Sequence, residues 1–411
     1  MKLVLLSRKI PTESTETIIP ILRELGNSYG TPLGIVCDMS KAIIAAVEAV
    51  FPGVRIFLCH FHFLRDLGKD LLKNDYDLLM SILRGFDVKT TLSRFTRELR
   101  DLVQNYSSLS CYLEGSVADI FSQNLPEEVL AYLLVEWIQN YTTTLAGYGF
   151  PFDRAHLAQV QRMEMAYEYL QKVPLKTTDR LIRVRDYLEE VLRNPKLQGC
   201  IKCVKRKVAH FDQLRAIMRI APQDGKDGLN DDGKEVDMSE MKRQLQGFIS
   251  LDEIKQAGLE DIGYRKMVMQ VEKYKDRLFT DGVDCVDAEG KKVHIQPERT
   301  NNLLERFFRG EKRGLRKRTG CKSLSQAFKT MVAETPYVKN LGNAEYEKVI
   351  LNGKANLAER FAEIDCKQVQ IAMKKHHEEQ GRLRPCVRKA IEDIHLLENI
   401  VQAYSKWQIA V

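Results

Sequence analysis

YGTPLGIVCDMSKAIIAAVEAVFPGVRIFLCHFH, residues 29–62, holds two short apolar runs on either side of a helical pattern. The runs Leu33 to Cys37 and Val54 to Leu58 have the length and the β-branched content of buried strands. The stretch from Ser40 to Val50 between them has helical spacing. A strand, a helix and a strand in this order predict an α/β sheet with parallel or mixed strands and helices on its faces.

The patterns on either side extend this prediction. Leu3 to Leu6 is a further apolar run, and Glu16 to Leu25 has helical spacing, so both are predicted to belong to the same sheet and its helices. After Phe63 a long α-helical block is predicted. Its strongest helical stretches are Leu67–Leu83, Leu92–Val103, Glu127–Tyr141, His156–Gln171 and Asp179–Leu192. Strand signals return in VDCVDAEGKKVHI, residues 283–295, which predicts a hairpin turning at Glu289 and Gly290.

The domain organisation follows from these changes of pattern. We predict an N-terminal part of the α/β core at residues 1–75 and an α-helical insertion at 76–280, which contains an acidic, solvated loop at 222–240. Residues 281–345 are predicted to complete the core, and residues 346–411 to form a helical tail.

The charge of the chain is concentrated in one segment. The 411 residues carry a formal net charge of +7. Residues 299–322 contain nine basic and two acidic residues, so this segment alone accounts for the whole excess. No apolar run approaches the ~20 residues that span a bilayer, and nine scattered cysteines do not resemble a disulfide framework. We therefore expect an intracellular protein with reduced thiols and no membrane partner.

Asp38 directly follows the apolar run that ends at Cys37. In open α/β sheets, ligands gather outside the carboxyl ends of strands, so a metal-binding role fits this position. The alternative is that Asp38 caps the helix that begins near Ser40, because Asp is a frequent N-cap residue. The residue pattern alone favours the cap.

Two groups of Cys and His could bind zinc. Cys59, His60 and His62 lie where the second apolar run passes into a helix. Cys59 and His62 have a spacing that can share zinc, but a structural zinc site needs four ligands and no second pair is evident. A second group lies in the helical block and consists of Cys200, Cys203 and His210. For both groups, packing and hydrogen bonding are the favoured interpretation, and zinc is the alternative.

Glu305 lies in PERTNNLLERFFRGEKRGLRKRTG, residues 297–320. On a helix it shares a stripe with Arg309, Lys312 and Arg316, which is typical of a solvated face with i,i+4 ion pairs. The alternative is a catalytic carboxylate next to a basic surface. The residue pattern alone favours the solvated face.

Taken together, these features resemble the Mutator-like branch of the DDE transposases. The shared features are a strand-end Asp, a Cys-x-x-His after the next strand, a long helical block, and Thr-Asn-Asn-x-x-Glu leading into a basic run. The resemblance covers roughly residues 2–342. It implies an RNase H-like α/β core interrupted by a large α-helical insertion, with a helical C-terminal tail.

The resemblance also assigns roles to residues. Asp38 matches the second catalytic acid and Glu305 the third, and both would bind Mg²⁺ in a two-metal site for DNA cleavage and strand transfer. Cys59 and His62 match the Cys-x-x-His signature of the branch. The family has its first catalytic Asp on the first strand, and this sequence has no Asp before Asp38. We therefore expect a chain truncated before that Asp, with an incomplete site and no activity as given.

The implied partner is double-stranded DNA, both transposon ends and target, and the resemblance allows a homodimer. The implied location is the cytoplasm, in association with DNA. The residues expected to contact DNA phosphates are Arg299, Asn301, Asn302, Arg306, Arg309, Lys312, Arg313, Arg316, Lys317 and Arg318. A second hypothesis is a non-catalytic, transposon-derived DNA-binding protein.

Trp137 lies in YLLVEWIQNY, residues 132–141, within the helical block. Insertion domains of related transposases can present an aromatic side chain that stacks on an unpaired base. The alternative is core packing, because Leu133, Leu134, Trp137 and Tyr141 share a helical face. The pattern favours the core.

Overall fold

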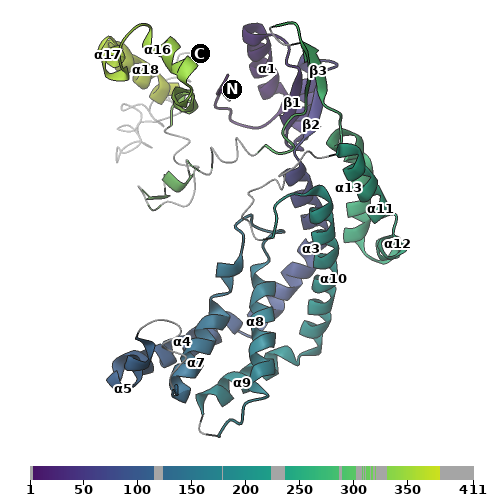
Figure 1. Cartoon of the computed structure of the whole chain (residues 1–411), viewed down its shortest axis with the longest axis vertical. Helices are drawn as coiled ribbons and strands as arrows, with labels where there is room; N and C mark the ends of the chain where they lie inside the picture. Colours follow the sequence, from purple (N-terminus) through teal and green to yellow (C-terminus); the bar gives the residue numbers. More distant parts are fainter. Residues whose placement is uncertain are drawn as a thin grey trace, which may run out of the picture. The chain divides into compact units, whose positions relative to one another are not determined.

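The structure is a computed structural model, and it divides the chain into two compact units. It describes residues 3–114, 124–177, 179–223, 237–286, 289–301 and 331–379, together with residues 308, 310, 312–314, 316, 317 and 320. One unit is Thr31–Asn302, and the other combines Met1–Gly30 with Leu303–Val411. The described residues are mostly helical, with two small sheets (Figure 1).

The unit Thr31–Asn302 begins with the predicted strand, helix and strand. β1 (Gly34–Cys37) pairs in parallel with β2 (Arg55–Leu58), and α2 (Lys41–Val50) connects them. Gly34 allows close packing across this pair, because a Cβ atom there would lie 2.8 Å from the ring of Phe57. The α/β expectation for this segment is confirmed at the level of these elements.

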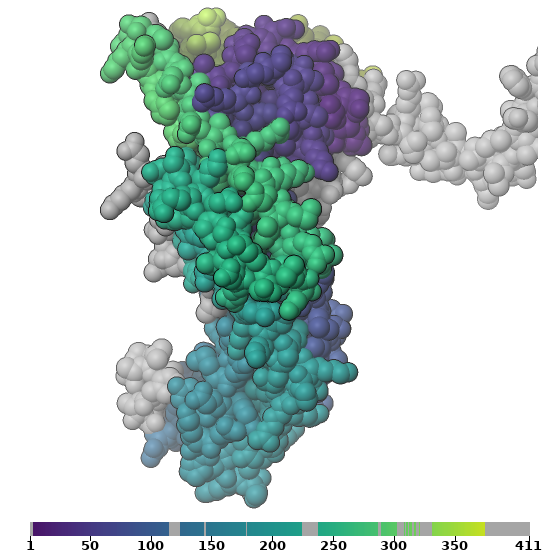
Figure 2. Space-filling model, turned by 90° about the vertical axis from the view of Figure 1, so that its right-hand side faces the viewer, coloured from purple at the N-terminus to yellow at the C-terminus, as the bar shows by residue number. Residues whose placement is uncertain are grey.

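The helical block follows β2, as the sequence predicts. Its longer helices are α3 (His60–Gly85), α4 (Val88–Asn105), α7 (Glu127–Gln139), α8 (Ala155–Leu170), α9 (Arg180–Leu192) and α10 (Pro195–Met218). Shorter turns lie between them: α5 (Ser107–Ser110), η1 (Cys111–Leu113) and η2 (Tyr141–Thr144). The block continues with α11 (Met238–Ile249), α12 (Asp252–Glu260) and α13 (Ile262–Leu278). Figure 2 shows this unit from the side of α11–α13, drawn in green.

Two apolar cores stabilise this unit, and α3 and α10 contribute to both. The first core packs the start of α3 and the end of α10 against α11, α12 and α13, with Phe63, Phe211 and Tyr264 fully buried. The second packs the end of α3 and the start of α10 against α4, α7, α8 and α9. In Figure 1, α3 and α10 run side by side between these two groups of helices.

The hairpin prediction is confirmed. β3 (Val283–Val286) pairs with β4 (Lys292–Ile295) in an antiparallel register that sets Val283 opposite Ile295. Gly290 has a φ of 82°, the left-handed conformation that favours glycine in a turn. The predicted acidic loop at 222–240 extends too far, because α11 begins at Met238, where the side chain of Asp237 accepts hydrogen bonds from the N–H groups of Ser239 and Glu240.

The second unit contains α1 (Thr15–Tyr29), η3 (Thr335–Gly342), α16 (Ala344–Leu351), α17 (Leu357–Ala362) and α18 (Cys366–Glu379). The predicted strand at Leu3–Leu6 is wrong, since this segment has no assigned secondary structure and belongs to neither sheet of the described residues. The buried side chain of Asn340 accepts from the N–H of Val4 at 2.7 Å and donates to its carbonyl at 2.9 Å. These two bonds satisfy Val4 without a partner strand.

Candidate functional site

The candidate site lies at the carboxyl edge of the two parallel strands. Cys37 ends β1 opposite Leu58, which ends β2, so Asp38 and Cys59 both emerge at this edge. The N–H of Cys59 donates to the carbonyl of Cys37 at 2.8 Å and extends the pairing by one step. The register therefore brings two of the predicted site residues together. The edge can be recognised from sequence because a polar or nucleophilic residue, Asp38 or Cys59, directly follows each strand.

The carboxylate of Asp38 stabilises the start of α2. Its Oδ1 accepts a hydrogen bond from the N–H of Ser40 at 2.9 Å. Ser40 occupies the N-cap position, and its own side chain makes no capping hydrogen bond. Asp38 thus stabilises the start of α2, as the cap interpretation predicts, although it lies two residues before the N-cap residue. One oxygen of Asp38 is engaged in this way.

The Cys59–His62 pair forms a hydrogen-bonded cluster at the start of α3. His62 Nδ1 lies 3.2 Å from Cys59 Sγ, and both side chains are buried. The same sulfur accepts from the backbone N–H of Asn301 at 3.3 Å. Across the described residues, no three His, Cys, Asp or Glu side chains gather as a metal site would require. The geometry of this pair fits a hydrogen bond that positions the backbone of residue 301 better than it fits a zinc site with four ligands.

Residues 299–301 return to this edge after the helical block. The carbonyl of Arg299 accepts from the N–H of His60 at 2.9 Å. Thr300 is 2% exposed, and its hydroxyl has no hydrogen-bond partner among the described residues. Together with the bond from Asn301 to Cys59, these contacts fix the segment against the first turn of α3. The chain thus joins residues that are about 240 positions apart in sequence.

His60 and Arg299 bind the ends of two helices. His60 Nε2 lies 2.8 Å from the carbonyl of Leu278, the last residue of α13. Arg299 Nη1 donates to the carbonyl of Met218, the last residue of α10, at 2.7 Å. Carbonyls at a helix C-terminus lack partners within the helix, and a cation there is favourable. These two contacts tie α3, α10, α13 and residues 299–301 together.

Burial disfavours charge on two side chains of this cluster, His60 and Cys37. Burial lowers the pKa of His60 to about 4, and the nearby Arg299 acts in the same direction. Burial also raises the pKa of the Cys37 thiol to about 12, with further contributions from Asp38 and Cys59. His60 is therefore neutral and Cys37 is a thiol at pH 7. In this state His60 is not an imidazolium acid and Cys37 is not a thiolate nucleophile.

Arg299 is an anchor in this structure, whereas the sequence predicts a DNA contact. It is only 7% exposed, and its guanidinium reaches the Met218 carbonyl inside the protein. Physically, a buried guanidinium needs an internal acceptor, and the end of α10 provides one. The anchoring roles of His60 and Arg299 were missed because their partners are helix ends, which no local spacing identifies.

The remaining predicted DNA contacts divide into two sets. Lys312, Arg313, Arg316 and Lys317 are exposed and have helical backbone conformation. The following predicted site residues lie outside the described residues: Asn302, Glu305, Arg306, Arg309 and Arg318. The predicted approach of the Glu305 carboxylate to Asp38 stays a prediction.

The described residues do not by themselves form a Mg²⁺ site. Mg²⁺ prefers octahedral coordination by several oxygen ligands. At this edge Asp38 is the one predicted carboxylate that lies within the described residues, and its Oδ1 already accepts from Ser40. No catalytic step follows from these residues alone.

Comparisons of the chain with protein-family models, with curated proteins and with solved structures found no match. The geometry of the edge is therefore the basis for any assignment. Within the described ranges, no helix combines the length and the apolar character needed to cross a membrane.

The second Cys/His group does not converge on a metal. Cys200 and His210 are ten residues apart on α10, a rise of about 15 Å, which is too far for a shared ion. Each side chain has another partner: Cys203 Sγ lies 3.5 Å from Asp75 Oδ1, and His210 Nδ1 lies 2.6 Å from the hydroxyl of Tyr264. The packing and hydrogen-bonding interpretation of this group is the one that the structure bears out.

Trp137 does not pack in the core. Its side chain is 38% exposed, and the guanidinium of Arg162 lies 5.0 Å from the ring centroid. The buried face of α7 is formed by Ala131, Val135 and Ile138, and Trp137 falls beside this stripe. The core prediction is wrong because Trp137 lies about 100° or more around the helix from each of these three residues.

Proposed function

We propose that this chain is a Mutator-like DDE-type DNA transposase or a fragment of one. The observation that carries the proposal is the hydrogen bond from Asn301 to Cys59. It holds the start of the Thr-Asn-Asn-x-x-Glu motif at the strand edge that bears Asp38. If the chain is a transposase of this type, the Thr-Asn-Asn-x-x-Glu motif must return to the edge that bears Asp38 after a helical insertion. A chance similarity of motifs does not require this return.

The finer fold belongs to the same proposal. We regard β1, α2 and β2 as the part of an RNase H-like core that carries the second acid, and α3–α13 as its helical insertion. Asp38 and Glu305 are the proposed Mg²⁺ ligands. When bound, two Mg²⁺ ions would stabilise the attacking and leaving oxygens of a phosphodiester. The role of Cys59 and His62 in this proposal is to position the segment that precedes Glu305.

The first test is DNA binding by the basic segment. Replacing Lys312, Arg313, Arg316 and Lys317 with alanine should reduce the slope of log affinity against log salt by about 3–4 for a duplex of arbitrary sequence, since each lost phosphate contact contributes about 0.9. Fluorescence anisotropy of a labelled duplex at several salt concentrations measures this slope.

The matched control removes four exposed lysines outside the basic segment: Lys89, Lys196, Lys202 and Lys255. This variant should keep most of the wild-type slope. Equal slopes for the two variants would place the DNA contact elsewhere. A wild-type chain that does not bind DNA would overturn the proposed function.

The second test concerns catalysis. We expect the 411-residue chain to bind DNA but not to nick a supercoiled plasmid in Mg²⁺ or Mn²⁺. The reason is that no Asp precedes Asp38, and a site short of one carboxylate loses a ligand and the charge that holds two dications together. Conversion of plasmid to the open circle on a gel measures nicking. Metal-dependent nicking that disappears in Asp38→Asn would contradict this expectation.

The alternative function is a non-catalytic, transposon-derived DNA-binding protein, and it is favoured by the bond from the N–H of Ser40 to Asp38, which gives this carboxylate a structural role that needs no metal. Both hypotheses require DNA binding. They differ in metal dependence, because a catalytic chain needs a divalent ion at Asp38, whereas a DNA-binding protein does not. Nicking that depends on Asp38 therefore decides for the enzyme.

A further inference from the structure

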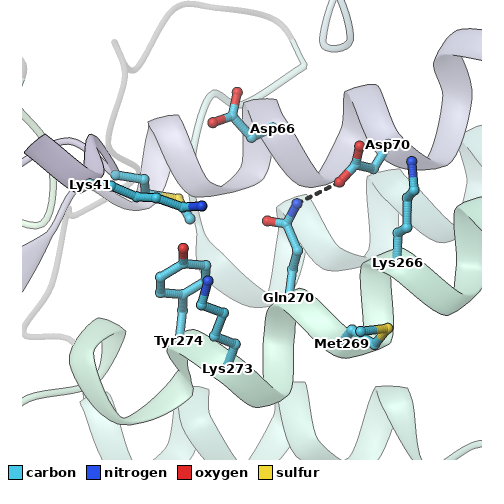
Figure 3. Close-up of a pocket in the computed structure, with 9 residues that line it drawn as sticks. Lys41, Asp66, Asp70, Lys266, Met269, Gln270, Lys273 and Tyr274 are labelled. Atoms are coloured by element: carbon cyan, nitrogen blue, oxygen red, sulfur yellow. Dashed lines mark hydrogen bonds between the residues drawn. The ribbon is translucent and has the colours of Figure 1, made fainter.

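A solvent-open groove lies between α3 and α13, beside the start of α2. Its volume is about 430 Å³. We define this α3–α13 groove by three lysines, Lys41, Lys266 and Lys273, and by Asp66, Asp70 and Tyr274. Figure 3 shows that α3 supplies the two aspartates and that α13 supplies Lys266, Lys273 and Tyr274.

The lysines are arranged along the groove. Lys266 and Lys273 are seven residues apart on α13, so they share a helix face and their Cα atoms are about 10 Å apart along the axis. Lys41 begins α2. In Figure 3, Lys41 and Lys273 extend into the same part of the groove from different elements, and the Tyr274 hydroxyl lies between them. All three lysines are exposed.

The two aspartates are already engaged by other groups. Asp66 Oδ1 pairs with Lys69 at 3.3 Å, and Asp70 Oδ2 accepts from the side-chain amide of Gln270. By contrast, no ion pair joins Lys41, Lys266 or Lys273 to another described residue. Lys273 Nζ lies 4.8 Å from the ring centroid of Tyr274, a cation–π contact that orients it at the groove wall. Asp66 thus has a cationic partner, whereas Asp70, among the described residues, is bonded only to a neutral amide, so the groove has three ammonium groups against one unneutralised carboxylate and keeps a net positive charge for an outside anion.

The groove begins at the candidate site. Met39, which lines it, directly follows Asp38. A chain of phosphates bound along α13 would therefore lead to the carboxyl edge of β1. The axial spacing of Lys266 and Lys273 corresponds to about three nucleotides of one strand of duplex DNA. A mononucleotide is too short to meet both lysines and Lys41.

We propose that the α3–α13 groove binds the phosphodiester backbone of a DNA strand that passes Asp38. This inference rests on the proposed function and adds a second DNA contact, separate from the basic segment at residues 299–322. Phosphates pair with Lys41, Lys266 and Lys273, which act as point charges without base specificity.

The test compares two double variants of the full chain. Lys266→Gln/Lys273→Gln removes two charges from the groove, and Lys202→Gln/Lys255→Gln removes two exposed charges from α10 and α12. The groove variant should reduce the slope of log affinity against log salt by about 2, and the control should leave it unchanged. All four substituted lysines are exposed, so both variants should keep the wild-type melting temperature. Lys273→Glu is a second variant, which reverses the charge of this lysine and should lower the affinity for DNA more than its neutralisation does.

The outcomes separate the inference from the function on which it rests. DNA binding by the wild type with equal slopes in both double variants overturns the groove and leaves the proposed function standing. If millimolar nucleoside triphosphate displaces the duplex from the wild type but not from the groove variant, the groove binds a free nucleotide. This result also overturns the inference. Failure of the wild type to bind DNA overturns both.

Discussion

Replacing Gly68 with alanine should lower the free energy of unfolding by about 2–3 kcal/mol. Gly68 lies inside α3, where a Cβ atom would sit 2.5 Å from Pro151 and even closer to the ring of Phe211. Phe211 is fully buried in the core that α3 and α10 share, so it cannot move aside without disturbing its neighbours. The cost of this overlap exceeds the ~1 kcal/mol that alanine gains over glycine in a helix.

The matched control is Gly199→Ala in α10. Position 199 is also helical, but a Cβ atom there meets nothing within 4 Å. This variant should be more stable than wild type by up to about 1 kcal/mol. Thermal unfolding followed by circular dichroism compares the two substitutions. Equal melting temperatures for the two variants would show that α3 and α10 do not pack as closely as described.

Acid should destabilise the protein through His60. Burial holds the pKa of His60 at about 4 in the folded chain, against its ordinary value of 6.5 when unfolded. Between these values the unfolded chain binds more protons, so this contribution to stability is complete above pH 6.5 and is lost as the pH falls toward 4. The loss by pH 5 is about 2 kcal/mol on this basis.

His60→Gln isolates this effect. The glutamine amide can donate to the Leu278 carbonyl as the imidazole does, but it does not titrate. Urea unfolding at pH 7 and pH 5 should show a smaller loss of stability for the variant than for wild type. The lowered pKa of His156 contributes to both chains and therefore cancels. An identical loss in both chains would mean that His60 titrates normally.

Local patterns were sufficient for much of this fold. The succession of β1, α2 and β2 follows from periodicity, as do the helices of the helical block and the hairpin at 283–295. For the wrong strand prediction, the deciding partner lies far away in sequence. The Leu3–Leu6 run is not a strand because Asn340 satisfies Val4 across more than three hundred residues.

The candidate site shows the same division. The meeting of Asp38 and Cys59 at one edge follows from two parallel strands, which the sequence predicts. The anchoring of His60 and Arg299 does not, because their acceptors are the last carbonyls of α13 and α10. Every helix end has such backbone carbonyls, whatever its side chains are. The sequence therefore does not indicate which helix end His60 or Arg299 contacts.

The sharing of α3 between both cores has a mechanical consequence. The helix is about 39 Å long, with Cys59 at its base and the second core at its far end. It acts as a lever, since a tilt of about 5° around its first turn moves the far end by roughly 3 Å. A force on the helices of the second core therefore acts on the hydrogen bond between Cys59 and Asn301. A small displacement at that bond produces a larger displacement at the far end of α3.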